Sequence, residues 1–281
     1  MIVGSEITSI RSPRVKAARQ LTKRSFRERA RSFLAEGPQA VREALGAPPG
    51  GSGCAVVSEL FVTGSAWARH AGLAAQASEQ GAAVQTVSGE VMAELAQTVT
   101  PQGVLAVCRF VDVPLEKLVG AAPQLVVLLA NVRDPGNAGT VLRTADAAGA
   151  DGVVFSDASV DPYNGKCVRA SAGSLFHLPV VAGSPLRHSA AALSRAGVRI
   201  LAADGSARRK LDEAEAAGDL RGPTAWLLGN EAWGLPADLL SLADEAVAVP
   251  IYGRAESLNL AAAAAVCLYA SARCLRGSAG P

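Results

Sequence analysis

A polar cluster that could do chemistry follows the apolar run at 125–130. Residues 131–145 leave this run through an Asp-Pro-Gly turn, and the spacing predicts a helix that starts near Asn137, a residue suited to an N-cap. Arg143 interrupts an otherwise small and apolar helix. A guanidinium near the start of such a helix suits contact with a phosphate or another substrate group, whereas the alternative is a surface arginine on an ordinary helix.

A second polar cluster, Gly229-Asn230-Glu231, follows the apolar run at 224–228. A glycine at the end of a strand allows the backbone to approach a ligand closely. The other interpretation is a plain strand-to-helix turn that is capped at Asn230. The cluster therefore predicts either a ligand contact or a structural turn.

The third cluster lies between the apolar run at 246–251 and an alanine-rich segment at 261–275. Pro250 lacks an N–H for the sheet, so it is expected to end the preceding strand. Ser257 or Asn259 can cap the helix that follows. The apolar backbone on either side of Pro250 could form the wall of an adenine-sized pocket.

The elements that must position these clusters are strands buried on both faces. Apolar runs alternate with helical or loop segments after residue 124, as expected for a parallel sheet flanked by helices, and they lie at 125–130, 152–155, 177–181, 198–202, 224–228 and 246–251. In an open parallel sheet the ligand binds beyond the carboxyl ends of the strands. Polar and glycine residues directly after the runs should therefore mark one site.

Charge is distributed unevenly along the chain. Residues 1–45 contain ten Lys and Arg and four Glu, whereas the whole chain has a net charge of only +2. An excess of basic residues is expected where a protein contacts phosphates, although a solvated basic helix face has the same composition. The candidate RNA-binding residues are basic side chains of this region: Arg11, Arg14, Lys16, Arg19, Lys23, Arg24 and Arg27.

Residues 1–112 are expected to form a small α/β domain. Two helical segments are predicted within 5–46 and further helices at 65–80 and 88–98, with strands at 55–57, 60–62, 84–87 and 104–111. Pro114 and the Gly-Ala-Ala-Pro stretch at 120–123 then indicate a linker at 113–123. The remaining part, 124–281, holds the predicted parallel sheet and the three polar clusters.

Bulk composition narrows the class of protein further. With 281 residues, 49% of them hydrophobic, the chain has ample material for a buried core. The apolar runs fall short of the ~20 residues that span a bilayer, and the basic N-terminus does not fit a signal peptide, so a cytoplasmic protein without a membrane partner is expected. The five cysteines form no CxxC pair or His cluster at metal spacing, so reduced thiols and no metal site are expected.

Taken together, the three clusters resemble the signature motifs of the SpoU (TrmH) branch of the SPOUT methyltransferases. The matching positions are Asn137 and Arg143, then Leu228-Gly229-Asn230-Glu231 with Gly234-Leu235-Pro236, then Ser257-Leu258-Asn259. Their order and spacing fit, and the match covers residues 124–275. Residues 7–16 and 33–37 resemble, over a shorter length, the ribosomal-protein-like (L30e-like) RNA-binding domain that precedes the catalytic domain in many relatives.

The resemblance implies a fold, a cofactor and an assembly. It implies an α/β fold in which a parallel-sheet SPOUT domain ends in a C-terminal trefoil knot, an exception to the rule against threaded chains. It also implies a homodimer with sites near the interface, and S-adenosylmethionine held in a bent conformation by the knot loops. The implied cofactor-binding residues are Leu228, Gly229, Asn230, Val249, Ile251 and Leu258, and the implied catalytic residues are Arg143, Asn137, Glu231, Ser257 and Asn259.

The function that the resemblance implies is S-adenosylmethionine-dependent 2′-O-methylation of a ribose in ribosomal RNA. The alternatives are a transfer RNA ribose methyltransferase of the same branch, or a catalytically silent RNA-binding or ribosome-assembly protein. A small-molecule methyltransferase would leave the basic N-terminus unexplained, and base methylation fits the third motif less well. Because a guanidinium is effectively always protonated, we expect Arg143 to fix the target phosphate and stabilise charge on the 2′-oxygen rather than act as a base.

Overall fold

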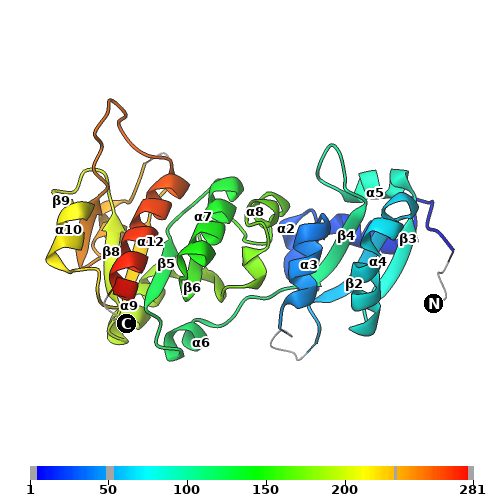
Figure 1. Cartoon of the computed structure of the whole chain (residues 1–281), viewed down its shortest axis with the longest axis horizontal. Coiled ribbons are helices and arrows are strands. Elements are labelled where there is room, and N and C mark those ends of the chain that lie inside the picture. The colour runs from blue at the N-terminus through cyan, green and yellow to red at the C-terminus, as the bar shows by residue number, and fades with distance from the viewer. Residues whose placement is uncertain (1–4, 49–53, 231–232, 278–281) are drawn as a thin grey trace. The chain divides into compact units, whose positions relative to one another are not determined.

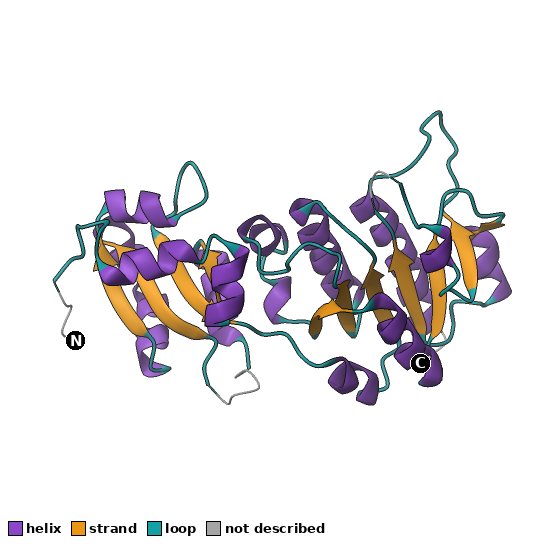
Figure 2. Ribbon diagram, turned by 180° about the vertical axis from the view of Figure 1, so that it is seen from behind, coloured by secondary structure: helices purple, strands orange, loops and turns teal. Residues whose placement is uncertain are grey.

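The computed structural model describes residues 5–48, 54–230 and 233–277. The chain divides into two compact units, the first formed by Met1–Val111 with Tyr163–His177 and the second by Asp112–Pro162 with Leu178–Pro281. Each unit contains its own sheet (Figure 1 and Figure 2). A short segment of the expected catalytic domain therefore packs with the N-terminal unit.

The first unit is built on a four-stranded mixed sheet in the order β1-β4-β2-β3. Its elements are α1 (Pro13–Gln20), α2 (Arg24–Ala30), β1 (Ser32–Glu36), α3 (Pro38–Gly46), β2 (Val57–Thr63), α4 (Gly64–Glu79), β3 (Ala83–Val87), α5 (Gly89–Leu95), β4 (Val104–Arg109), α8 (Gly165–Ala170) and the 3₁₀ turn η1 (Ser174–Phe176). β4 runs antiparallel to β1 and β2, and β2 is parallel to β3. The expected helices at 65–80 and 88–98 are confirmed as α4 and α5.

The prediction for residues 5–46 is wrong in one respect, because this region contains a strand as well as helices. β1 pairs antiparallel with β4, and the side chains of Phe33, Leu34 and Ala35 are buried. The strand depends on a partner far along the chain, and such pairing overrides the helical pattern of the basic residues around it.

Aromatic contacts attach the segment Tyr163–His177 to the first unit. The ring centroids of Tyr163 and Phe33 are 4.7 Å apart, and those of Tyr163 and Phe110 are 3.8 Å apart. The buried Tyr163 hydroxyl accepts a hydrogen bond of 2.9 Å from the backbone N–H of Val111. These contacts join residues that are distant in sequence, which is why the apolar pattern alone did not reveal them.

The second unit is a seven-stranded sheet in the order β7-β6-β5-β10-β8-β11-β9, and its described strand pairs are all parallel. Its elements are α6 (Leu115–Gly120), β5 (Leu125–Leu129), α7 (Pro135–Ala148), β6 (Gly152–Ser156), β7 (Val180–Ser184), α9 (Leu186–Arg195), β8 (Arg199–Ala203), β9 (Arg209–Lys210), α10 (Leu211–Ala217), β10 (Thr224–Leu228), α11 (Ala237–Leu240), β11 (Glu245–Ala248) and α12 (Leu260–Gly277). The six apolar runs of the sequence correspond to β5, β6, β7, β8, β10 and β11. The predicted parallel α/β fold is therefore confirmed.

Helices cover both faces of the parallel sheet. On one face α7 and α12 pack against each other and against β5 (Figure 1). On the other face Leu118 of α6 and Leu193 of α9 share an apolar cluster with Val126 of β5. The expected linker at 113–123 is thus corrected, because it contains α6, whose apolar side chains belong to this core.

The last helix, α12, is long and apolar enough to cross a membrane by length and composition alone, and 44% of its 18-residue window is buried inside the protein. The fully buried Trp226 of β10 donates a hydrogen bond of 2.9 Å from Nε1 to the Ser271 hydroxyl of this helix. Burial raises the pKa of the Cys267 thiol to about 12. These are the contacts of a core helix, in which Cys267 packs as a small apolar residue.

Candidate active site

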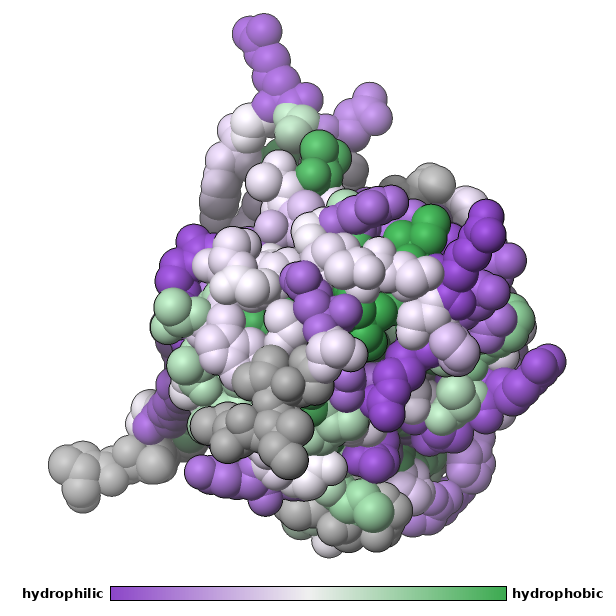
Figure 3. Space-filling model, turned by 90° about the vertical axis from the view of Figure 1, so that its right-hand side faces the viewer, coloured by the Kyte–Doolittle hydropathy of each residue, from purple (hydrophilic) through white to green (hydrophobic). Residues whose placement is uncertain are grey.

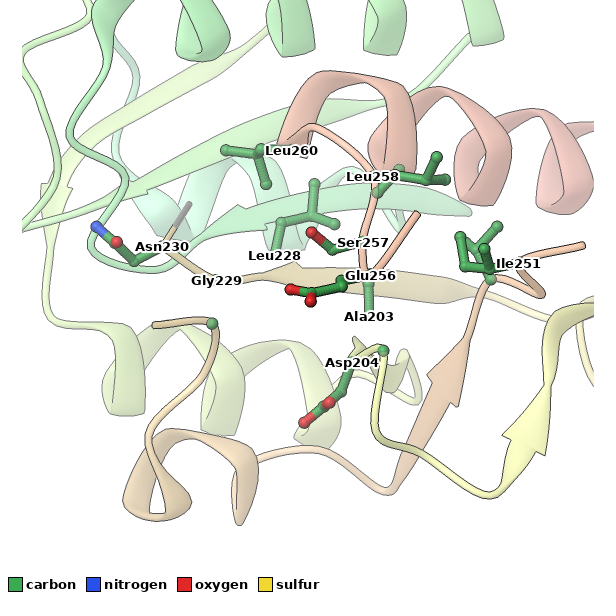
Figure 4. Close-up of a pocket in the computed structure, with 14 residues that line it drawn as sticks. Ala203, Asp204, Leu228, Gly229, Asn230, Ile251, Glu256, Ser257, Leu258 and Leu260 are labelled. Carbon is green, nitrogen blue, oxygen red and sulfur yellow. The ribbon is translucent and has the colours of Figure 1, made fainter. Parts of the chain in front are cut away.

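The strand ends of the second unit carry a pocket of about 280 Å³ (Figure 4). Its lining comes from the last residues of β8 and β10, the segments that follow β8, β10 and β11, and the start of α12: Ala203, Asp204, Gly205, Leu228, Gly229, Asn230, Gly234, Val249, Ile251, Glu256, Ser257, Leu258, Leu260 and Ala263. This is the place where an open parallel sheet is expected to bind a ligand. Every cofactor-binding residue named from the sequence lines this strand-end pocket.

Gly229 lines the strand-end pocket at a position without room for a side chain. A Cβ atom added there would lie 2.6 Å from the backbone C and O atoms of Gly234 and 2.8 Å from Cγ of Leu235. Asn230 and Gly234 exchange two backbone hydrogen bonds of 3.0 and 2.9 Å, so the loop folds back on itself. A glycine is therefore required here because the backbone of Gly234 lies so close. The absence of a side chain also leaves the backbone of Gly229 facing the pocket.

The segment before α12 forms another wall of the pocket. Glu256, Ser257 and Leu258 line the pocket together with Ala203 and Leu228 of the strand ends (Figure 4). Asn259 follows this segment and caps α12, since its Oδ1 accepts a hydrogen bond of 2.9 Å from the N–H of Ala261. The prediction that Ser257 or Asn259 caps the final helix is confirmed for Asn259.

Asn259 also links the pocket segment to α7. Its Nδ2 donates a hydrogen bond of 3.1 Å to Oδ1 of Asn137. The expectation that Asn137 is an N-cap is wrong, because α7 begins at Pro135 and Asp134 is the cap, accepting a hydrogen bond of 2.8 Å from the N–H of Asn137. Proline suits the first helical position, so the cap falls on the residue before it.

Of the catalytic candidates that the structure describes, Ser257 lines the pocket, whereas Asn137, Arg143 and Asn259 do not. Arg143 is an exposed residue of α7 and does not line the pocket. Glu231 falls outside the described residues. The structure thus joins Asn259 to Asn137 by a hydrogen bond, and it places Arg143 further along the helix that carries Asn137.

The charged residues among those that line the strand-end pocket, Asp204 and Glu256, are both acidic. Asp204 is fixed at the end of β8, where its Oδ1 accepts hydrogen bonds of 2.8 and 2.7 Å from the N–H and hydroxyl of Ser206. An acidic lining favours a ligand with positive charge. Sequence reasoning missed Asp204 and Gly205, although they directly follow β8 and the strand-end rule would have found them.

No group of three or more His, Cys, Asp or Glu side chains in the described ranges is placed to hold a metal ion. The cysteines described there are all free thiols. The strand-end pocket itself is lined by backbone and apolar groups, two carboxylates, the hydroxyl of Ser257 and the amide of Asn230.

The basic residues of the N-terminus differ in what their charges contact. Three of these residues are exposed and have no acidic partner among the described residues: Arg11, Lys16 and Lys23. Ion pairs with glutamates engage three others: Arg14 with Glu59, Arg19 with Glu94, and Arg24 with Glu28. These ion pairs compensate much of the N-terminal positive charge within the fold. On the molecular face seen in Figure 3, hydrophilic and intermediate residues predominate and strongly hydrophobic ones are scattered.

Arg27 is a correction to the candidate RNA-binding set. Its side chain is 3% exposed, and its Nη1 donates hydrogen bonds of 2.9 and 2.8 Å to the carbonyl oxygens of Leu21 and Thr22. The guanidinium therefore satisfies carbonyl groups just after α1 and does not face solvent. Helical spacing showed a basic side chain but not that the turn after α1 would enclose it.

Both parts of the chain match known families. Residues 124–269 match the SpoU rRNA Methylase family, and residues 12–106 match the MRM3-like substrate binding domain. The chain is 35% identical over 267 residues to the 23S rRNA (guanosine(2553)-2′-O)-methyltransferase RlmP of Bacillus subtilis. The aligned region covers 94% of this chain and 98% of that protein.

Solved structures agree with these matches. An AdoMet-bound rRNA methyltransferase from Sinorhizobium meliloti is 32% identical and has a TM-score of 0.82, covering 95% of this chain and 97% of that one. The SpoU methyltransferase AviRb from Streptomyces viridochromogenes, in complex with AdoMet, is 28% identical and has a TM-score of 0.77, covering 96% of this chain and all of that one.

The chain belongs to the SpoU rRNA methylase family. It is a methyltransferase with a SPOUT-type parallel sheet, and its cofactor is S-adenosylmethionine, as the sequence motifs predicted. The strand-end pocket fits this cofactor, because apolar Leu228, Val249 and Ile251 suit an adenine ring and the two carboxylates suit the cofactor's positive charges.

Proposed function

We propose that the chain methylates the 2′-hydroxyl of a ribose in ribosomal RNA, with S-adenosylmethionine as the methyl donor. The observation that carries this proposal is the strand-end pocket, which gathers every cofactor-binding residue named from the motifs at one edge of the sheet. Support for the substrate comes from the relatives, since RlmP is named as a 23S rRNA 2′-O-methyltransferase and the Sinorhizobium meliloti protein as an rRNA methyltransferase.

The cofactor, when bound, supplies an electrophilic methyl group on a positively charged sulfur. The residues of the chain hold the cofactor and the ribose so that the 2′-oxygen lies in line with the methyl group. In this proposal the backbone at Leu228, Gly229 and Asn230 and the side chains of Val249, Ile251 and Leu258 hold the cofactor. Ser257 lies in the same lining, where its hydroxyl can position the incoming ribose.

Arg143 is assigned to the RNA rather than to the cofactor. It is exposed on α7, the helix that Asn259 ties to the pocket segment through Asn137. A permanently charged guanidinium cannot accept the proton of the 2′-hydroxyl. It can donate two parallel hydrogen bonds to the target phosphate and stabilise negative charge on the attacking oxygen. Asn137 and Asn259 then set the position of α7 relative to the pocket, and Glu231 completes the set by motif.

We also propose that the enzyme is a homodimer with a trefoil knot in its C-terminal region. The family match over residues 124–269 supports the knot. Exposed apolar side chains support the dimer: Val266 and Tyr269 on α12 are 42% and 45% exposed, and Ile251 and Leu258 beside the pocket are 38% and 39% exposed. A second copy that covers these side chains would place a protein surface next to each cofactor site.

The N-terminal unit is assigned to substrate binding, with an L30e-like fold. Its four-stranded sheet is flanked by helices, and residues 12–106 match a substrate binding domain. The exposed Arg11, Lys16 and Lys23 supply positive charge for phosphates at this end of the chain. A cytoplasmic location belongs to the same proposal, since the substrate is ribosomal RNA.

The experiment that tests the function maps ribose methylation in ribosomal RNA from cells with and without the gene. Loss of one methylated ribose, restored by purified enzyme and labelled S-adenosylmethionine on the unmodified RNA, is the expected result. Label that enters transfer RNA instead would assign the chain to the alternative substrate. Binding of ribosomal RNA with no transfer of label to any RNA would identify a catalytically silent protein.

A further inference from the structure

The first unit contains a second pocket, of about 270 Å³, which the methyl-transfer reaction does not use. It lies where the start of α3 meets the loop at 97–103 and helix α8, and we call it the α3 pocket. The polar and charged side chains in its lining include Glu36, Gln39, Thr100, Gln102 and Arg169. The pocket lies in the unit that matches a substrate binding domain, so we ask which part of a substrate its groups could contact.

The backbone at the start of α3 offers hydrogen-bond donors to the α3 pocket. The first helical hydrogen bond recorded there runs from the N–H of Val41 to the carbonyl of Gly37, at 3.1 Å. Pro38 has no N–H, and no side chain caps this end of the helix. The N–H groups of Gln39 and Ala40, whose residues line the pocket, are thus the uncapped donors of the first turn.

Arg169 adds a positive charge whose position is fixed by its neighbours. Its Nη1 lies 3.5 Å from Oε2 of Glu36 and 3.4 Å from Oε1 of Gln97. The carboxylate of Glu36 is 9% exposed and also accepts hydrogen bonds from the N–H of Gln97, at 3.0 Å, and from the Thr98 hydroxyl. The Glu36 carboxylate therefore has three partners, which hold it beside the guanidinium. The other N–H groups of Arg169 can then contact a ligand.

The rim of the α3 pocket offers contacts of a different kind. Thr100 and Gln102 are exposed, and no hydrogen bond of their side chains is recorded among the described residues. A rim with hydroxyl and amide groups beside the guanidinium of Arg169 suits a nucleotide, which carries sugar and base next to its phosphate.

We propose that the α3 pocket binds a phosphodiester of the substrate RNA. Arg169 and the first N–H groups of α3 contact the phosphate oxygens, while Thr100 and Gln102 contact the sugar or base beside it. Arg169 and Ala172 belong to the region that matches the methylase family, whereas the other lining residues belong to the substrate binding domain. The pocket is therefore complete only when Tyr163–His177 is docked on the first unit. This inference rests on the proposed RNA substrate.

The test compares charge variants of the full-length enzyme in binding to an unmodified 23S rRNA transcript over a range of salt concentrations. Gln102→Glu places a negative charge at the pocket without removing a recorded contact, and Gln102→Lys places a positive one. We expect Gln102→Glu to weaken binding about tenfold and Gln102→Lys to retain or tighten it. Arg169→Ala should weaken binding and lower the slope of log Kd against log salt by about one.

Ala71→Glu, on the exposed side of α4, is the matched control because it makes the same change in net charge outside the pocket. Equal weakening by Gln102→Glu and Ala71→Glu, or no weakening by either, would overturn the site. S-adenosylmethionine affinity, measured by calorimetry, should be unchanged in all variants. A wild-type enzyme that binds S-adenosylmethionine but not the transcript would refute the proposed substrate, and the α3 pocket assignment with it.

Discussion

The strand-end pocket of the second unit and the basic helices of the first unit were both expected to bind ligands, and they differ in what fixes their functional groups. In the strand-end pocket, much of the lining is backbone or apolar residues whose position follows from where each strand ends. In the basic helices, by contrast, the function of a side chain depends on its neighbours in the fold, as Arg24 and Arg27 illustrate. Topology thus determines the first site, and side-chain partners determine the second.

The largest expected effect separates chemistry from cofactor binding at the strand ends. Arg143→Lys should lower kcat by about 100-fold or more, since an ammonium group is a point charge that lacks the planar fork of a guanidinium. The affinity for S-adenosylmethionine should be unchanged, because Arg143 does not line the pocket. Single-turnover methylation assays and calorimetry measure the two quantities, with Arg195→Lys as a surface control. Near-normal turnover in Arg143→Lys would remove Arg143 from the reaction.

A substitution at Gly229 tests whether the backbone controls the strand-end pocket. Gly229→Ala adds a Cβ within 2.6 Å of the Gly234 backbone, so the loop must open. Overpacking of this kind costs ~2 kcal/mol, which corresponds to a loss of about 30-fold in affinity for S-adenosylmethionine. Gly222→Ala is the matched control, since nothing lies within 4 Å of an added Cβ there. Wild-type affinity in Gly229→Ala would contradict a backbone-controlled site.

The same comparison explains which features could be predicted from the sequence. The six buried strands show as apolar runs because both faces of a parallel sheet are covered, and the strand-end rule then locates the pocket. β1 and the docking of Tyr163 on Phe33 depend on contacts between distant residues, which no local pattern records. The burial of Arg27 was missed for the same reason, since its acceptors belong to a turn whose path is set by packing.

A smaller effect is expected at Asn259, which has two separable contacts. Asn259→Ser keeps a good N-cap for α12 but is too short to reach Asn137. We expect the free energy of unfolding to stay within ~0.5 kcal/mol and methylation to fall about tenfold, because α7 is no longer tied to the pocket segment. Asn259→Ala should lose both contacts and ~1 kcal/mol of stability by thermal denaturation. Equal activity in Asn259→Ser and wild type would limit Asn259 to capping.

The smallest effects concern the basic helices, where three neighbouring positions should give three different results. Lys23→Ala removes an exposed charge without a recorded acidic partner, so affinity for the RNA transcript should fall about threefold. Arg24→Ala removes a charge that is paired with Glu28, and we expect less than a twofold change. Arg27→Ala leaves two carbonyl groups without their donor, so it should cost ~1–3 kcal/mol of stability.

Affinity and stability have to be measured on the same preparations, because an unfolded Arg27→Ala protein would imitate a loss of RNA contact. Filter binding at several salt concentrations reports the RNA contacts, and chemical denaturation reports the fold. If all three alanine variants weakened RNA binding equally at unchanged stability, the basic residues would act as one diffuse positive surface. Whether a cation is paired, buried or available would then make no difference to RNA affinity, and the number of basic residues alone would determine it.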